Sequence, residues 1–194
     1  MNKKVLFSML LAIATVFGAS AQKLSGDISR LKGQREVNLV IDFSQTLVNG
    51  RDKQVIIDAE TRRKTAEEKE RYIREWNEDL PAQAYALFTT EINNRLKDKA
   101  MITVGNYPNA EYTINIKLTN ITVGYFAGIT QKASDLNAEL TFVKTGETTP
   151  FGTILYKKHS NLASSYIPYF VTRIVMSFGT LGVNAGIIIN KNLK

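Results

Sequence analysis

The spacing of apolar residues changes twice along this chain, and the order of the two periods is the strongest constraint on its fold. From Val37 to Ser44 apolar and polar residues alternate, which indicates a strand with one face on a core. Apolar residues then recur every three or four positions from Thr65 to about Lys99, and alternation returns after Glu111. This order predicts an α+β fold, a two-layer sandwich with helices on one face of a mostly antiparallel sheet.

The long helix has an explicit start signal. Thr65-Ala66-Glu67-Glu68 matches a capping box, in which the Thr and Glu side chains satisfy backbone donors at a helix start. Trp76 lies on the apolar stripe of this helix, so we expect it to be buried. Pro81 either kinks the helix or opens a second one at its first turn, where a missing N–H costs nothing.

Three strands and a last helix are predicted after the long helix. The alternating segments 112–119, 136–143 and 151–156 should form an antiparallel meander. Apolar residues at helical spacing from Ile167 to Ile188 predict a C-terminal helix with Arg173 and Ser177 on its polar face. Its uncharged stretch, residues 174–189, is short for a membrane span, so we expect this helix to pack on the sheet.

Two segments before the long helix are less regular. Asn49-Gly50 is a strong turn dipeptide, and residues 54–58 are predicted to form a short returning strand. Residues 22–35 are polar and contain Gly26 and Gly33, so we expect an irregular lead-in. Residues 36–194 are then predicted to form a single domain, the usual outcome for a chain of this length.

The first 21 residues have the pattern of a secretory signal peptide. Lys3 and Lys4 form a positive start, residues 5–18 are almost entirely apolar, and Ala19-Ser20-Ala21 supplies the small residues that a signal peptidase accepts. We therefore expect cleavage before Gln22 and a periplasmic or secreted protein. The chain has no Cys, so neither a lipoprotein anchor nor a disulfide scaffold is predicted, and the core must hold the fold.

Two motifs in the predicted strands carry a family resemblance. The segments are Ala110-Glu111-Tyr112-Thr113-Ile114 and Leu140-Thr141-Phe142-Val143-Lys144-Thr145-Gly146. Their arrangement resembles the N-terminal domain of TolB and related small envelope domains of Gram-negative bacteria. The lead-in 26–33 and the Ala21-Gln22 junction resemble uncharacterised exported proteins of Bacteroidota. The resemblance covers most of the chain after residue 21 and implies an α+β envelope domain, but no particular activity.

The charge balance is mildly basic. Lysine and arginine number 25 against 18 acidic residues, a formal charge of +7, and the excess is spread over termini and turns. Export makes an envelope protein, an outer-membrane component or a membrane surface a more natural partner than nucleic acid, which we do not expect to bind.

Few residues suggest chemistry, and no catalytic, metal or cofactor site is predicted. The single histidine, His159, has no partner pattern and is expected on the surface or in a loop. Asp42 and Glu139 are weak polar-site candidates because each sits inside an apolar strand pattern. Both carboxylates could equally face solvent on a wet face of the sheet.

An apolar connection between two predicted strands is the better candidate for an interaction surface. In the segment Gly124 to Ile129, Tyr125, Phe126 and Ile129 lie between glycines in what should be a hairpin tip. An exposed tip of this composition suits docking to a partner or contact with a membrane interface. The alternative is a tip folded back onto the core beneath the C-terminal helix.

These observations favour an exported, non-enzymatic envelope protein that acts as a protein- or envelope-binding module. An envelope-directed enzyme, or a carrier of a small ligand or lipid, is the alternative, and it requires a pocket between helices and sheet lined by Asp42 or Glu139. A membrane-inserting subunit is a third class, and it would need a detachable C-terminal helix.

Overall fold

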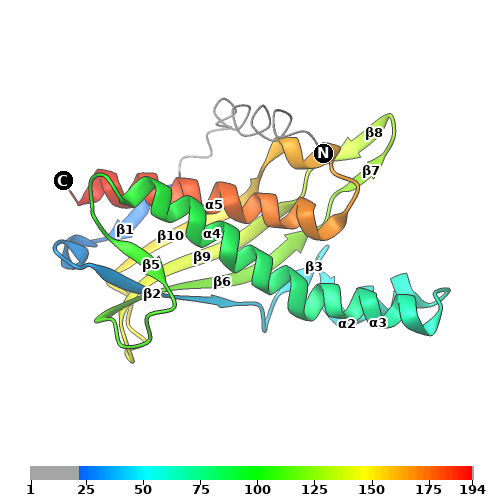
Figure 1. The fold of residues 1–194 in the computed structure, drawn as a ribbon, viewed down its shortest axis with the longest axis horizontal. Helices are drawn as coiled ribbons and strands as arrows, with labels where there is room; N and C mark the ends of the chain where they lie inside the picture. Colours follow the sequence, from blue (N-terminus) through cyan, green and yellow to red (C-terminus); the bar gives the residue numbers. More distant parts are fainter. Residues whose placement is uncertain (1–21, 194) are drawn as a thin grey trace.

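The computed structural model describes residues 22–193, in which two layers pack face to face (Figure 1). The predicted signal peptide, residues 1–21, lies outside these residues. The main sheet has the strand order β1 (Leu24–Gly26), β10 (Gly152–Ser160), β9 (Asp135–Lys144), β6 (Tyr112–Thr122), β2 (Glu36–Asp42) and β5 (Thr103–Gly105). Beyond the end of β2, the short strand β3 (Leu47–Val48) pairs with β6, and β4 (Arg51–Asp52) pairs with β3.

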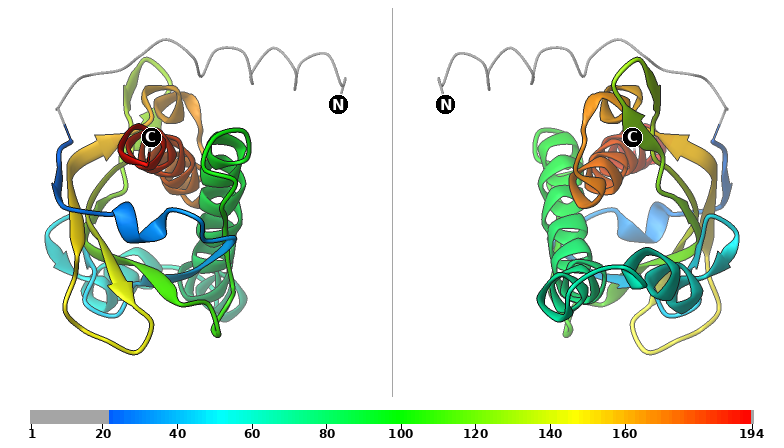
Figure 2. Two further views of the ribbon diagram at one scale, coloured as in Figure 1. Left: turned by 90° about the vertical axis from the view of Figure 1, so that its left-hand side faces the viewer. Right: turned by 90° about the vertical axis from the view of Figure 1, so that its right-hand side faces the viewer.

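Helices cover one face of this curved sheet and leave the other open (Figure 2). The covering layer consists of α4 (Leu80–Leu96) and α5 (Phe170–Asn192), which pack side by side. The shorter helices α2 (Lys53–Thr61) and α3 (Ala66–Arg74) extend from one end of α4 (Figure 1). The structure therefore confirms the predicted α+β fold with helices on one face.

The sheet is mixed, with an antiparallel part and a parallel part. The predicted meander is confirmed, since β9 pairs antiparallel with both β6 and β10. β2 instead pairs parallel with β6 and with β5. The parallel register follows from the chain path, because the long helix returns the chain to the end of the sheet where β2 began.

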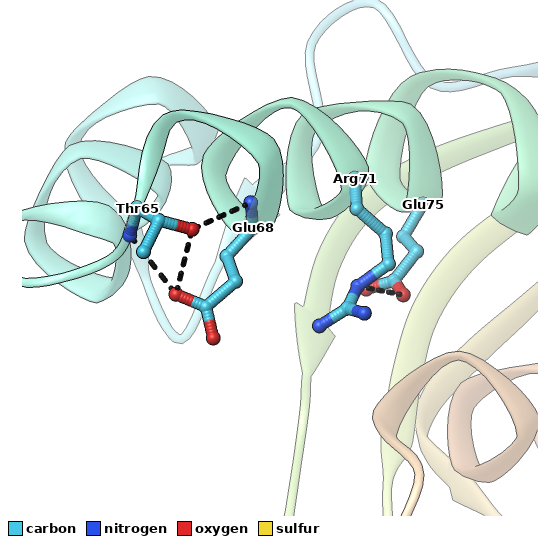
Figure 3. Close-up of polar contacts among 4 residues, drawn as sticks. All are labelled: Thr65, Glu68, Arg71 and Glu75. Carbon is cyan, nitrogen blue, oxygen red and sulfur yellow. Dashed lines mark hydrogen bonds and ion pairs between the residues drawn. The ribbon is translucent and has the colours of Figure 1, made fainter.

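The capping box predicted at Thr65 is present, as Figure 3 shows. The backbone N–H of Thr65 donates to Glu68 Oε2 at 2.9 Å, and the backbone N–H of Glu68 donates to Thr65 Oγ1 at 3.3 Å. One turn later Arg71 Nε lies 3.9 Å from Glu75 Oε1. The helix then continues without a break through a π-helical turn, η3 (Glu75–Asp79), into α4, with Pro81 in the first turn of α4. Trp76 is buried as predicted.

Close packing between α4 and α5 depends on small residues of α5. A Cβ atom built on Gly182 would lie 2.6 Å from the backbone oxygen of Phe88, so no larger residue fits without moving a helix. The glycine face of α5 thus meets α4 of the same chain. By length and composition α5 could cross a membrane, but 67% of its apolar window is buried inside the fold, as in a core helix.

The predicted polar face of α5 is wrong in part, since Arg173 and Ser177 are buried. Both donate hydrogen bonds to backbone carbonyls. The helix also begins at Phe170 rather than at Ile167, which follows the short helix η4 (Leu162–Tyr166).

Two predictions for the N-terminal third are wrong. Residues 54–58 form part of helix α2 and not a returning strand, because the Asp52 side chain accepts the backbone N–H of Gln54 and caps a helix there. The lead-in is not irregular. It contributes the edge strand β1, a short helix η2 (Ser29–Leu31), and two fully buried core residues, Ile28 and Leu31.

Candidate functional site

The connection between β6 and β9 forms a small hairpin that projects beyond the main sheet (Figure 1). Its strands β7 (Tyr125–Ala127) and β8 (Thr130–Lys132) pair only with each other in the described residues. Gly124 at its base has φ +69°, and a Cβ there would lie 2.3 Å from the carbonyl oxygen of Lys132. The tight entry into the hairpin therefore requires glycine.

The predicted tip residues are exposed and not folded onto the core. Tyr125 is 50% exposed and Phe126 39%, and Ile129 at the turn is fully exposed. Helix η4 lies against both hairpin strands and adds two further exposed side chains, Leu162 and Tyr166. We call these five residues the apolar end of the molecule. Contiguous apolar side chains of this kind mark interaction sites on soluble proteins.

A buried polar network fixes the hairpin and η4 to α5. Ser134, directly after β8, donates from Oγ to the carbonyl of Thr122 at 3.0 Å and from its backbone N–H to Ser164 Oγ at 3.2 Å. Ser177 of α5 donates to the Ser134 carbonyl at 3.1 Å. Ser134, Ser164 and Ser177 are fully buried, so these bonds are shielded from water.

Arg173 completes this anchor network. Its Nε donates to the carbonyl of Val123 at 3.0 Å, just before the hairpin, and its Nη1 donates to the carbonyls of Ile167 and Pro168. The guanidinium thus clamps the hairpin base to the segment that joins η4 to α5. Sequence reasoning missed the network, because all but one of its acceptors are backbone carbonyls, which no residue pattern reveals.

The two weak polar-site candidates, Asp42 and Glu139, lie together on the open face of the sheet. Strand register places Lys117 between them, since Asp42 pairs with Lys117 and Lys117 with Glu139. With Val40, Asn115 and Thr141 they line a shallow depression of about 390 Å³. This depression faces away from the helices, so it is not the pocket between helices and sheet that the carrier alternative requires.

The environment of Asp42 in this depression does not prepare it as a general acid. Hydrogen bonds from the side chain and the backbone N–H of Ser44 lower the pKa of Asp42, so this carboxyl stays ionised and is no proton donor at neutral pH. Within the described residues Lys117 forms no ion pair with either carboxylate. Nor do residues 22–193 contain a group of three or more His, Asp or Glu side chains placed to hold a metal ion.

The prediction that His159 lies on the surface is wrong, because its side chain points into the core. A bulge between Tyr156 and His159, with Lys158 at φ +47°, shifts the alternation of β10 by one residue. Gln22 Nε2 donates to His159 Nδ1 at 3.0 Å, while within residues 22–193 the Tyr156 hydroxyl has no hydrogen-bond partner. Burial lowers the pKa of His159 to about 4, so the ring is neutral at pH 7.

Comparisons with known proteins give only distant similarity. No protein-family model matches the chain, and no curated protein is significantly similar to it. Among solved structures, a PelC dodecamer from Paraburkholderia phytofirmans is similar with a TM-score of 0.44 and 7% sequence identity, covering 84% of this chain and 97% of that chain. A second PelC dodecamer from the same organism has a TM-score of 0.41 and 8% identity, covering 84% and 94%. The resemblance to TolB and to Bacteroidota proteins stays a prediction.

Proposed function

We propose that this protein is an exported, non-enzymatic binding module of the cell envelope, and that it recognises its partner through the apolar end. One observation carries the proposal: Tyr125, Phe126 and Ile129 are exposed on a hairpin whose base is hydrogen-bonded to α5. Export itself is the expectation from residues 1–21.

The anchor network supports this function because it makes the hairpin a preorganised surface. A free hairpin with strands of three residues would be marginal in water and would lose conformational entropy on binding. Here Ser134 and Arg173 tie its base to α5 before any partner arrives. Binding energy from the aromatic side chains is therefore not consumed in ordering the hairpin.

The absence of enzymatic activity is supported by the state of the titratable candidates. His159 is buried and neutral, and Asp42 is held ionised on an open face. Neither environment prepares a general acid or base for a substrate at pH 7.

Replacing Tyr125 and Phe126 with Ser tests the proposed function. Because both are exposed, the free energy of unfolding should change by less than about 1 kcal/mol. Capture from the protein's own envelope fraction should weaken by at least roughly 2 kcal/mol, as truncation of binding anchors does. A matched control replaces two exposed apolar residues elsewhere, Val55 and Met101, with Ser, and it should bind normally. Normal capture by the Tyr125/Phe126 variant, or equal loss in the control, would refute the proposal.

A second candidate function rests on the depression at Asp42, Lys117 and Glu139. Charged groups of both signs and the neighbouring Asn115 and Thr141 offer hydrogen bonds to a polar envelope fragment. Titration calorimetry with soluble cell-wall fragments tests it. Binding that Asp42→Asn and Glu139→Gln abolish would support this function, and no detectable heat at millimolar fragment would remove it.

A further inference from the structure

Within the chain segments that build the apolar end the charged residues are all basic, and the acids Glu75 and Asp79 of η3 face Tyr169 at the end of the second segment. The segments 123–134 and 156–170, which build the hairpin and η4, contain Lys132, Lys157 and Lys158 and no acidic residue. All three lysines are exposed. Lys157 and Lys158 sit in the β10 bulge beside the start of β9, directly after the hairpin. The nearest acid along the chain, Asp135, is half-buried at the hairpin base.

The apolar side chains also surround the hairpin rather than covering one side of it. Successive strand residues point to opposite faces, so Tyr125 and Phe126 lie on opposite faces of β7. Ile129 lies between the strands at the turn, and Leu162 and Tyr166 of η4 extend the apolar surface. A flat protein surface would cover one face of such a wedge and leave the other in water. Insertion into the interfacial region of a membrane would instead cover both faces of the hairpin.

We propose that the apolar end inserts into the headgroup region of an anionic phospholipid bilayer. This inference rests on the proposed function and names its partner class. Tyr125, Tyr166 and Phe126 have the ring chemistry that favours the membrane interface, where a tyrosine hydroxyl stays hydrated. Lys132, Lys157 and Lys158 supply the charge that attracts lipid phosphates. The protein is thereby attached peripherally, with α5 remaining in its core.

Co-sedimentation of the protein, residues 22–194, with lipid vesicles tests this inference. Vesicles of phosphatidylcholine with about 30% of the anionic lipid phosphatidylglycerol are compared with vesicles of pure phosphatidylcholine. We expect at least tenfold tighter binding to the anionic vesicles, and weaker binding as salt shortens the range of the attraction. Tyr125→Ser with Phe126→Ser should reduce binding at least tenfold.

Charge variants separate the lysine contribution from general basicity. Lys157→Gln with Lys158→Gln should weaken binding to anionic vesicles by about 25-fold, from roughly fivefold per lysine near a charged surface. Lys97→Gln with Lys99→Gln removes the same charge just beyond the end of α4 and should bind like the wild type. Equal losses in both pairs would overturn the proposal, as would equal binding to neutral vesicles.

The result with vesicles is independent of the result with the envelope fraction. If the protein ignores both kinds of vesicle but the apolar end still controls capture from the envelope, the lipid inference fails while the proposed function stands. Loss of that capture after protease treatment of the envelope would then identify a protein partner. If replacing the apolar end affects neither binding, both proposals fail.

Discussion

Replacing Gly182 with Ala tests how tightly the two covering helices are packed. The added Cβ would lie 2.6 Å from the Phe88 backbone oxygen, against about 3.4 Å for an ordinary contact. The helices must therefore separate by several tenths of an ångström, because a backbone atom cannot rotate away. Overpacking of this kind costs roughly 1 to 3 kcal/mol. Alanine has a higher helix propensity than glycine, which restores about 1 kcal/mol. We therefore expect the free energy of unfolding to fall by up to about 2 kcal/mol.

Gly179→Ala is the matched control on the same helix face. Its Cβ would meet the end of the Leu87 side chain at 2.9 Å, and that side chain can change rotamer. The propensity gain should then dominate, leaving this variant as stable as the wild type or up to about 1 kcal/mol more stable. Urea unfolding followed by the fluorescence of buried Trp76 measures both. A Gly182→Ala protein at least as stable as Gly179→Ala would refute the packing argument.

Two further predictions concern the core. Phe88→Ala should cost about 3 to 5 kcal/mol in urea unfolding, since Phe88 is fully buried, and a loss below 1 kcal/mol would contradict that burial. Because the folded pKa of His159 is about 4 against about 6.5 unfolded, the unfolded state binds the extra proton between these values. As the pH drops from 6.5 to 4, the free energy of unfolding of the wild type should therefore fall by up to about 3 kcal/mol more than that of His159→Gln. If the two proteins lose stability in parallel, the lowered pKa of His159 is wrong.

The spacing of hydrophobic residues is sufficient to predict the helices and strands that bury one face. The meander strands, the long helix and its Thr65 cap follow local patterns that the structure keeps. The glycines and the position between two predicted strands place Tyr125 and Phe126 in a hairpin, but they do not distinguish an exposed tip from one folded onto the core. That choice depends on distant hydrogen bonds, in which Arg173 donates to the carbonyl of Val123 and Ser177 donates to the carbonyl of Ser134.

The sequence-based predictions are wrong at positions where a single residue changes the local pattern. Asp52 caps a helix where the Asn49-Gly50 turn predicts a returning strand, and the bulge at Lys158 turns His159 inward. The parallel pairing of β2 depends on where the chain returns after α4, which no local period encodes. Asp42 and Glu139 were recognised as a polar face, but their alignment with Lys117 needed the register of three strands.

A tryptophan reporter at the turn of the hairpin tests the central claim most directly. Ile129→Trp, in a Trp76→Phe background, places the only indole at a fully exposed position of the apolar end. Free protein should show water-like emission that acrylamide quenches strongly. When the protein binds membrane vesicles prepared from its own envelope, the emission should shift to the blue and the quenching should fall. An indole that stays water-like and fully quenched while the protein co-sediments would show that binding occurs elsewhere.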